Sequence, residues 1–101
     1  MPDQQQPEQQ PISEARMDKF ENAGYRLLQP MTIHYQRLGS GYVASWPEAN
    51  IAVSGTTRED AYQALEIEIL DAFDDWSADE AALGPGPQRQ FAVLKKYIQR
   101  C

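Results

Sequence analysis

One long amphipathic segment, from Arg58 to about Trp76, constrains the fold more than any other part of this 101-residue chain. Apolar residues recur in it at the three- and four-residue spacing of an α-helix. Thr57 precedes the segment as a typical N-cap, and Asp60 completes a weak capping box. No other segment is long and apolar enough to cover a small sheet. The buried stripe of this predicted helix consists of Ala61, Leu65, Ile69, Ala72 and Trp76.

Three short strands are predicted ahead of this helix. Residues 32–38 and 42–46 are rich in strand-forming side chains and flank a Gly-Ser-Gly turn, where glycine readily adopts positive φ angles. Pro47 lacks an amide hydrogen and ends the second strand. A third strand follows at 51–54. Because the connections are short, we predict an α+β fold over residues 31–76, an antiparallel three-stranded meander covered by one long helix.

The rest of the chain is predicted to lie around this core. Residues 1–12 are rich in Gln and Pro, have few apolar side chains to bury, and are expected to be a disordered tail. Residues 13–30 are expected to form a peripheral helix, capped by Ser13 and ended by Gly24, followed by a lead-in that is either an edge strand or coil. Residues 77–101 are expected to contain a Gly-Pro-Gly-Pro turn and a second, basic helix. A fourth strand is the alternative over that last stretch. The apolar residues that favour the helix are Phe91, Leu94 and Ile98.

Charge and cysteine content restrict the classes of function. The net charge of −6 disfavours general binding to nucleic acid. Residues 59–80 contain nine acids, whereas residues 81–101 contain four bases and no acid. The single cysteine, Cys101, allows no internal disulfide, which fits a reducing compartment. With no secretory signal and no apolar run of membrane length, we expect a soluble cytoplasmic protein.

The sequence provides no catalytic constellation. His34 is the only histidine, and no cysteine or histidine cluster suggests a metal site. The carboxylates of Asp71, Asp74 and Asp75 are spaced so that they could hold Mg²⁺, but such a trio is more often a solvated helix face. We therefore expect no catalytic, cofactor or metal site, and no enzyme. A magnesium-dependent nuclease that uses these three carboxylates is the enzymatic alternative.

One stretch resembles a known family. The motifs are Gly41-Tyr42-Val43-Ala44, then Trp46-Pro47-Glu48, then Gly55-Thr56-Thr57-Arg58-Glu59-Asp60-Ala61 followed by Ala64-Leu65. In their order and spacing they resemble the HicB-like antitoxin domain, over roughly Met31 to Trp76. The resemblance implies a small sheet crossed by one helix, a truncated RNase H-like layout without that enzyme's active site. It also implies a partner, because members commonly mask a small basic RNA-cleaving toxin of the HicA type and are often dimers or higher oligomers.

Two departures from the family pattern limit what the resemblance implies. The loop Ala49-Asn50-Ile51-Ala52 differs from the usual family sequence at that place. Residues 77–101 are too short for a helix-turn-helix, so the sequence does not support DNA binding. The alternative to an antitoxin is a stand-alone adaptor or oligomeric scaffold with the same fold.

We assign residues to these expected roles as follows. The expected partner-binding residues are Tyr42, Trp46, Glu66, Ile67, Asp71, Asp74 and Asp75. The expected structural residues are Gly41, Pro47, Gly55, Thr57, Ala61, Leu65, Ile69 and Trp76.

Overall fold

Strands β3 (Met31–Leu38), β4 (Gly41–Trp46) and β5 (Ile51–Gly55) form the antiparallel meander that the sequence predicts. The structure is a computed structural model and describes residues 13–101, so the disordered tail predicted for residues 1–12 lies outside the described residues. Tyr35, Ala44 and Val53 are paired across the three strands. Because side chains alternate between the two faces of a strand, this register places all three on the face that packs against the long helix.

Two glycines hold the meander close to the start of the helix. A Cβ atom added at Gly41 would lie 2.7 Å from the carbonyl oxygen of Gly55, and one added at Gly55 would lie 2.5 Å from the amide nitrogen of Ala61. Both distances are too short for a side chain, so only glycine fits. In the hairpin between β3 and β4, Gly39 has a φ of 62°, which glycine adopts without steric cost.

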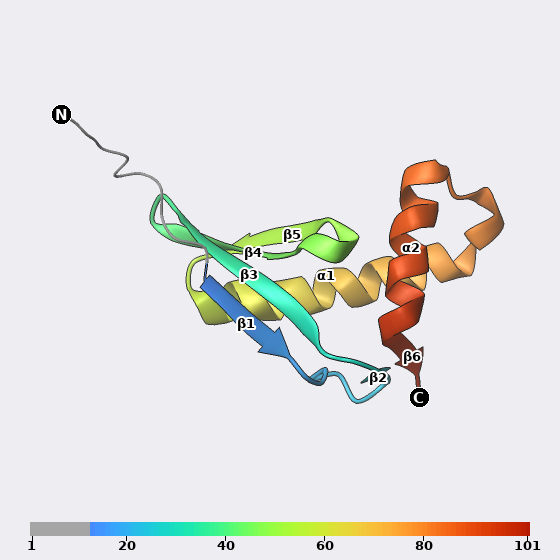
Figure 1. Cartoon of the computed structure of the whole chain (residues 1–101), viewed down its shortest axis with the longest axis horizontal. Coiled ribbons are helices and arrows are strands. Elements are labelled where there is room, and N and C mark those ends of the chain that lie inside the picture. The colour runs from blue at the N-terminus through green and yellow to red at the C-terminus, as the bar shows by residue number, and fades with distance from the viewer. Residues whose placement is uncertain (1–12) are drawn as a thin grey trace.

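Helix α1 (Arg58–Ala78) is capped as expected by Thr57, whose Oγ1 accepts a hydrogen bond from the Asp60 amide at 3.0 Å. The carboxylate of Asp60 accepts instead from the Thr56 hydroxyl at 2.6 Å, rather than from the Thr57 amide that would complete a capping box. Leu65 and Ile69 are fully buried, which confirms that the predicted stripe faces the core. Figure 1 shows α1 crossing one face of the sheet.

The segment predicted as a peripheral helix is a strand, and this prediction was wrong. Strand β1 (Ser13–Met17) pairs with β3 in antiparallel register, with Met17 opposite Met31, so the sheet has four strands in the order β1-β3-β4-β5. Exposure alternates along β1, ending on a fully buried Met17. Pairing with a neighbouring strand and burial of Met17 therefore outweigh the helix propensity of this segment. Phe20 is also buried, so the segment belongs to the core rather than to the periphery.

The C-terminal region contains the predicted second helix, with different ends. Helix α2 (Pro85–Tyr97) begins inside the Gly-Pro-Gly-Pro segment, because proline is well suited to the first turn of a helix. The last residues leave the helix and form β6 (Ile98–Arg100), which pairs with β2 (Tyr25–Leu27) in a separate two-stranded sheet. Two 3₁₀ turns, η1 (Pro47–Ala49) and η2 (Glu80–Ala82), connect the remaining elements.

The core lies between the sheet and the two helices. The Trp46 ring meets the Tyr97 ring edge-on, with centroids 4.9 Å apart, which joins β4 to α2. Phe91 of α2 packs against Phe73 and Trp76 of α1. Among the residues that the structure describes, no helix has the length and apolar character needed to traverse a lipid bilayer. The largest fully buried side chains are Trp46, Met17, Met31, Ile33, Leu65, Ile69 and Leu94.

Candidate functional site

Helix α1 presents two flanks with different surroundings. It packs mainly beneath β5 and β4, and it reaches β1 through a hydrogen bond from the Arg58 guanidinium to the Ser13 hydroxyl at 2.8 Å. Residues of a helix are about 100° apart, so Tyr62 and Glu66 project from one flank, and Glu68, Asp71 and Asp75 from the opposite one. Tyr62 lines a cavity together with Ala15 of β1, so the first flank faces β1. The opposite flank must then lie on the β5 side of the molecule.

On the β1 side, the carboxylate of Glu66 is buried and binds the backbone of the connection between β1 and β2. Both of its oxygens accept the amide of Glu21, at 3.0 and 3.1 Å, and one also accepts the amide of Asn22 at 3.1 Å. Only 6% of Glu66 is exposed. The structure therefore places this expected partner-binding residue in an internal structural role.

Asp74 is also engaged within the molecule. Its carboxylate accepts the Tyr25 hydroxyl at 2.5 Å and the Arg100 guanidinium at 2.6 Å, which ties α1 to both strands of the small sheet. The hydrogen bond from Tyr25, with the charge of Arg100, lowers the pKa of Asp74 below its ordinary value. The same hydrogen bond raises the pKa of the Tyr25 hydroxyl. Asp74 thus acts as a link between elements, unlike its neighbours in the predicted trio.

On the β5 side, three carboxylates remain on the surface, and we call Glu68, Asp71 and Asp75 the acidic flank. All three are exposed, and none forms an ion pair with any residue from 13 to 101. Ile67 borders them and is 61% exposed. An exposed apolar side chain beside uncompensated carboxylates is a surface that a basic protein could cover.

The two aromatic residues expected to bind a partner differ in exposure. Trp46 is 1% exposed and is therefore part of the core, not of a binding surface. Tyr42 is partly buried and lies near the Arg37 guanidinium, 5.9 Å from its ring centroid. Of the seven expected partner-binding residues, the structure therefore leaves three exposed, namely Ile67, Asp71 and Asp75.

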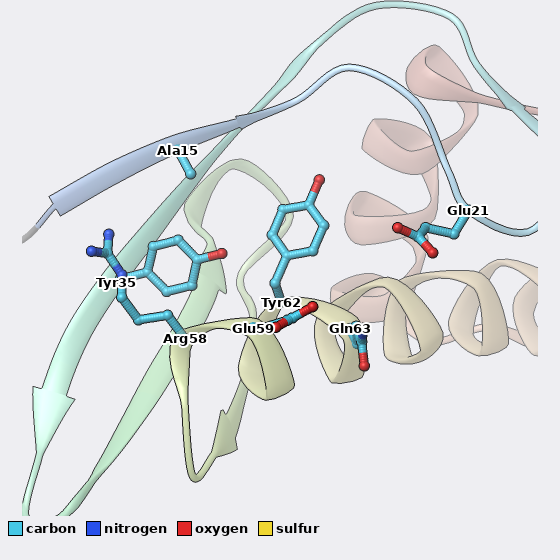
Figure 2. Close-up of a pocket in the computed structure, with 7 residues that line it drawn as sticks. All are labelled: Ala15, Glu21, Tyr35, Arg58, Glu59, Tyr62 and Gln63. Atoms are coloured by element: carbon cyan, nitrogen blue, oxygen red, sulfur yellow. The ribbon is translucent and has the colours of Figure 1, made fainter.

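A cavity of about 330 Å³ separates β1 from the N-terminal half of α1 (Figure 2). The rings of Tyr35 and Tyr62 form part of its wall, and the Arg58 guanidinium lies 4.7 Å from the centroid of the Tyr35 ring. Burial raises the pKa of both tyrosine hydroxyls. Neither hydroxyl makes a hydrogen bond to a residue from 13 to 101. The carboxylates of Glu21 and Glu59 also line the cavity, so its lining carries charges of both signs.

In the described part of the chain, the structure places each residue that was considered for metal binding or catalysis. No group of three His, Cys, Asp or Glu side chains there is placed to hold a metal ion. In particular, Asp74 turns to Tyr25 and Arg100, while Asp71 and Asp75 stay exposed. His34 lies on the sheet face away from α1, with its Nε2 atom 3.3 Å from a carboxylate oxygen of Glu14.

Several residues that the fold brings together had no predicted role. Tyr62 lies one position beside the predicted stripe, and Glu21 lies in a segment predicted to be helical. Tyr62, one helical turn before Glu66, was the only local sign that this side of α1 would pack against another element. The predicted meander already places residues 51–54 at an edge of the sheet, whereas the pairing of β1 with β3 at the other side was not predicted.

No family model, curated protein or solved structure matches this chain. The fold and its contacts must therefore support any proposal about function.

Proposed function

We propose that this protein is a protein-binding module of the HicB-like antitoxin type that masks a small basic RNA-cleaving protein of the HicA type. The observation that carries the proposal is the way the motif residues fit together. Gly41 lies against Gly55, and Gly55 lies against Ala61, at distances that exclude any side chain. The residues that carry the family resemblance are thus in direct contact, and they join the meander to the capped start of α1.

The layout supports the same proposal. Strands β3, β4 and β5 followed by α1 have the order that the family resemblance implies, a small sheet with one helix across it (Figure 1). In this reading β1 is an addition at the edge of a truncated RNase H-like core. The acidic flank and the exposed Ile67 supply a surface suited to a basic partner. Opposite charges mainly accelerate encounter and select the partner, while buried apolar contact adds affinity.

Co-expression tests this proposal. A small basic protein encoded beside this gene should arrest growth when expressed alone, and co-expression of this chain should restore growth and yield a co-purifying complex. The variant E68Q/D71N/D75N should weaken both effects, and E14Q/E21Q/E59Q, which removes three exposed carboxylates on the β1 side, serves as the control. If every small basic neighbour is harmless and none co-purifies, the antitoxin proposal is wrong.

One observation favours the stand-alone adaptor or scaffold as a second candidate. Helix α2 and β6 pack onto the core through Phe91, Tyr97 and the pairing with β2, so residues 77–101 are part of the same folded unit as the sheet. This candidate requires a stable homo-oligomer in sedimentation experiments and normal growth when the gene is deleted. An antitoxin paired with an active toxin would instead be needed for growth.

A further inference from the structure

Within residues 13–101 the outer edge of β5 has no partner strand, and β5 itself carries neither charge nor proline to protect that edge. β5 lies at the end of the strand order, and its backbone makes no hydrogen bond on that side to any residue from 13 to 101. Its sequence, Ile-Ala-Val-Ser-Gly, contains no charged residue and no proline. Edges are normally blunted by charge, proline or a covering element, because an open edge accepts another strand. The opposite edge, β1, carries Glu14 and Arg16.

α1 packs closely under β5 and β4, and its Tyr62 and Glu66 face the β1 side. From this arrangement we infer that the acidic flank, on the opposite side of the helix, faces the side on which the β5 edge is open. A strand added to β5 would run about 4.8 Å from it. Every second side chain of such a strand would point to the α1 side of the sheet, toward the three carboxylates.

A second copy of this chain is a poor occupant of the edge. Two β5 strands that pair in antiparallel fashion are related by a two-fold axis perpendicular to the sheet. Both α1 helices would then lie on the same face, with their acidic flanks turned toward each other. Like charges brought together in this way oppose association.

We propose that the β5 edge accepts an extended basic segment of a partner protein as a fifth strand of the sheet. Lysine or arginine at alternate positions of that segment pairs with Glu68, Asp71 and Asp75. The intervening positions lie beside Ala52 and Ser54 on the other face, where small or polar side chains fit. Main-chain hydrogen bonds supply affinity in such strand addition, and the alternate side chains supply specificity. This inference rests on the proposed function and specifies how the partner is held.

Nuclear magnetic resonance with a synthetic peptide tests the inference. The probe is a ten-residue peptide that alternates lysine and threonine, with blocked ends, added to the full-length protein. We expect alternate amides of residues 51–55 to exchange with solvent more slowly when the peptide is bound, while the amides of β1 are unchanged. A peptide of the same composition in which all lysines precede all threonines should not protect β5, because its charges do not match one face of a strand.

Matched variants separate strand addition from general attraction between opposite charges. The variants E68Q/D71N/D75N and E14Q/E21Q/E59Q each remove three negative charges, on the β5 side and on the β1 side respectively. Loss of three partly exposed ion pairs should weaken peptide binding about five- to ten-fold for the first variant and less than about two-fold for the second. Equal weakening, or protection of β1 instead of β5, would overturn the inference.

Sedimentation without peptide completes the test. Dimerisation that slows exchange at residues 51–55 would identify a second copy as the occupant and would refute the inference. A negative result with the peptide leaves the antitoxin proposal standing, because a toxin can be bound elsewhere. Conversely, peptide binding at β5 together with failure of every co-expression test would leave strand addition intact and reject the antitoxin role.

Discussion

The side chain of Glu66 binds the backbone amide of Asn22 at 3.1 Å, although the two residues are 44 positions apart in the chain. The same carboxylate holds the amide of Glu21. Hydrogen bonds from several amides replace much of the hydration that a carboxylate loses when it is buried. One acidic residue of α1 therefore fixes the path of the chain between β1 and β2.

Replacing Glu66 by glutamine should destabilise the protein by about 1–3 kcal/mol. The side-chain NH₂ group of glutamine would face the backbone N–H groups from which the carboxylate accepts hydrogen bonds. Urea unfolding measures the change, and hydrogen exchange at residues 21 and 22 should become faster. E68Q is the control, since Glu68 is exposed on the opposite flank and should change stability by less than about 0.5 kcal/mol. Equal losses in the two variants would show that the amide contacts of Glu66 contribute nothing.

Stability should depend on pH through the pair formed by Tyr25 and Asp74. The pKa of Asp74 is lowered in the folded state, so its contribution is complete above its ordinary value of 3.8 and is lost as pH falls through the lowered pKa. The pKa of Tyr25 is raised, so its contribution is complete below its ordinary value of 10.0 and is lost as pH rises through the raised pKa. Melting curves from pH 2 to pH 11 measure both limits.

The variant D74N should remove the acid-side dependence that this carboxylate causes and should lower Tm at pH 7 by about 1–5 °C. The alkaline-side loss should shrink as well, because Tyr25 no longer faces a charged acceptor. D75N changes an exposed neighbour and should leave the melting curve as it is in the native protein. If the Tm of D74N falls at low pH as it does in the native protein, other carboxylates cause that fall.

Replacing Gly55 by alanine should destabilise the protein by about 1–3 kcal/mol, because the new methyl group would lie 2.5 Å from the Ala61 amide nitrogen. Thermal unfolding checks this. The matched change is G86A in the first turn of α2, where an added Cβ has no neighbour within 4 Å and removal of glycine should leave stability equal or up to about 1 kcal/mol higher. Tolerance of alanine at both positions would contradict the close packing of β5 on α1.

Truncation of two apolar residues of α1 should change stability by very different amounts. L65A removes a fully buried side chain and should cost about 2–5 kcal/mol. I67A removes one that is 61% exposed and should change stability by less than about 0.5 kcal/mol. Once a partner protein is identified, I67A should nevertheless weaken its binding, which isothermal titration calorimetry would detect. A large loss of stability in I67A would place Ile67 in the core.

The parts of the fold that the sequence predicts well are those determined by local patterns. The strands at 32–38 and 42–46 have their own turn chemistry, and the Thr57 cap and the Leu65 stripe lie within one helix. Strand β1 was mistaken for a helix because five residues show little periodicity, and the strand that stabilises them begins fourteen residues later. The sequence alone contains no information on that pairing except through Met17, whose burial either structure could explain.

The candidate surface was predictable only in part, for a similar reason. An acidic residue on a helix is normally solvated, and Glu68, Asp71 and Asp75 follow that rule. Glu66 breaks it because backbone amides from a distant loop reach its carboxylate, and Trp46 is covered by Tyr97 from the other end of the chain. Such long-range contacts leave no trace in local spacing.

The connection from Asp18 to Pro30 is largely exposed, yet it is fastened at several places, among them Glu66, the bond from Tyr25 to Asp74, and the pairing of β2 with β6. Proteases cut where a stretch of backbone can detach and thread into their active site. Lys19 and Arg26 are therefore sheltered from trypsin for as long as these anchors hold. Digestion at these two residues would report on the loosening of the N-terminal half before the rest of the molecule unfolds.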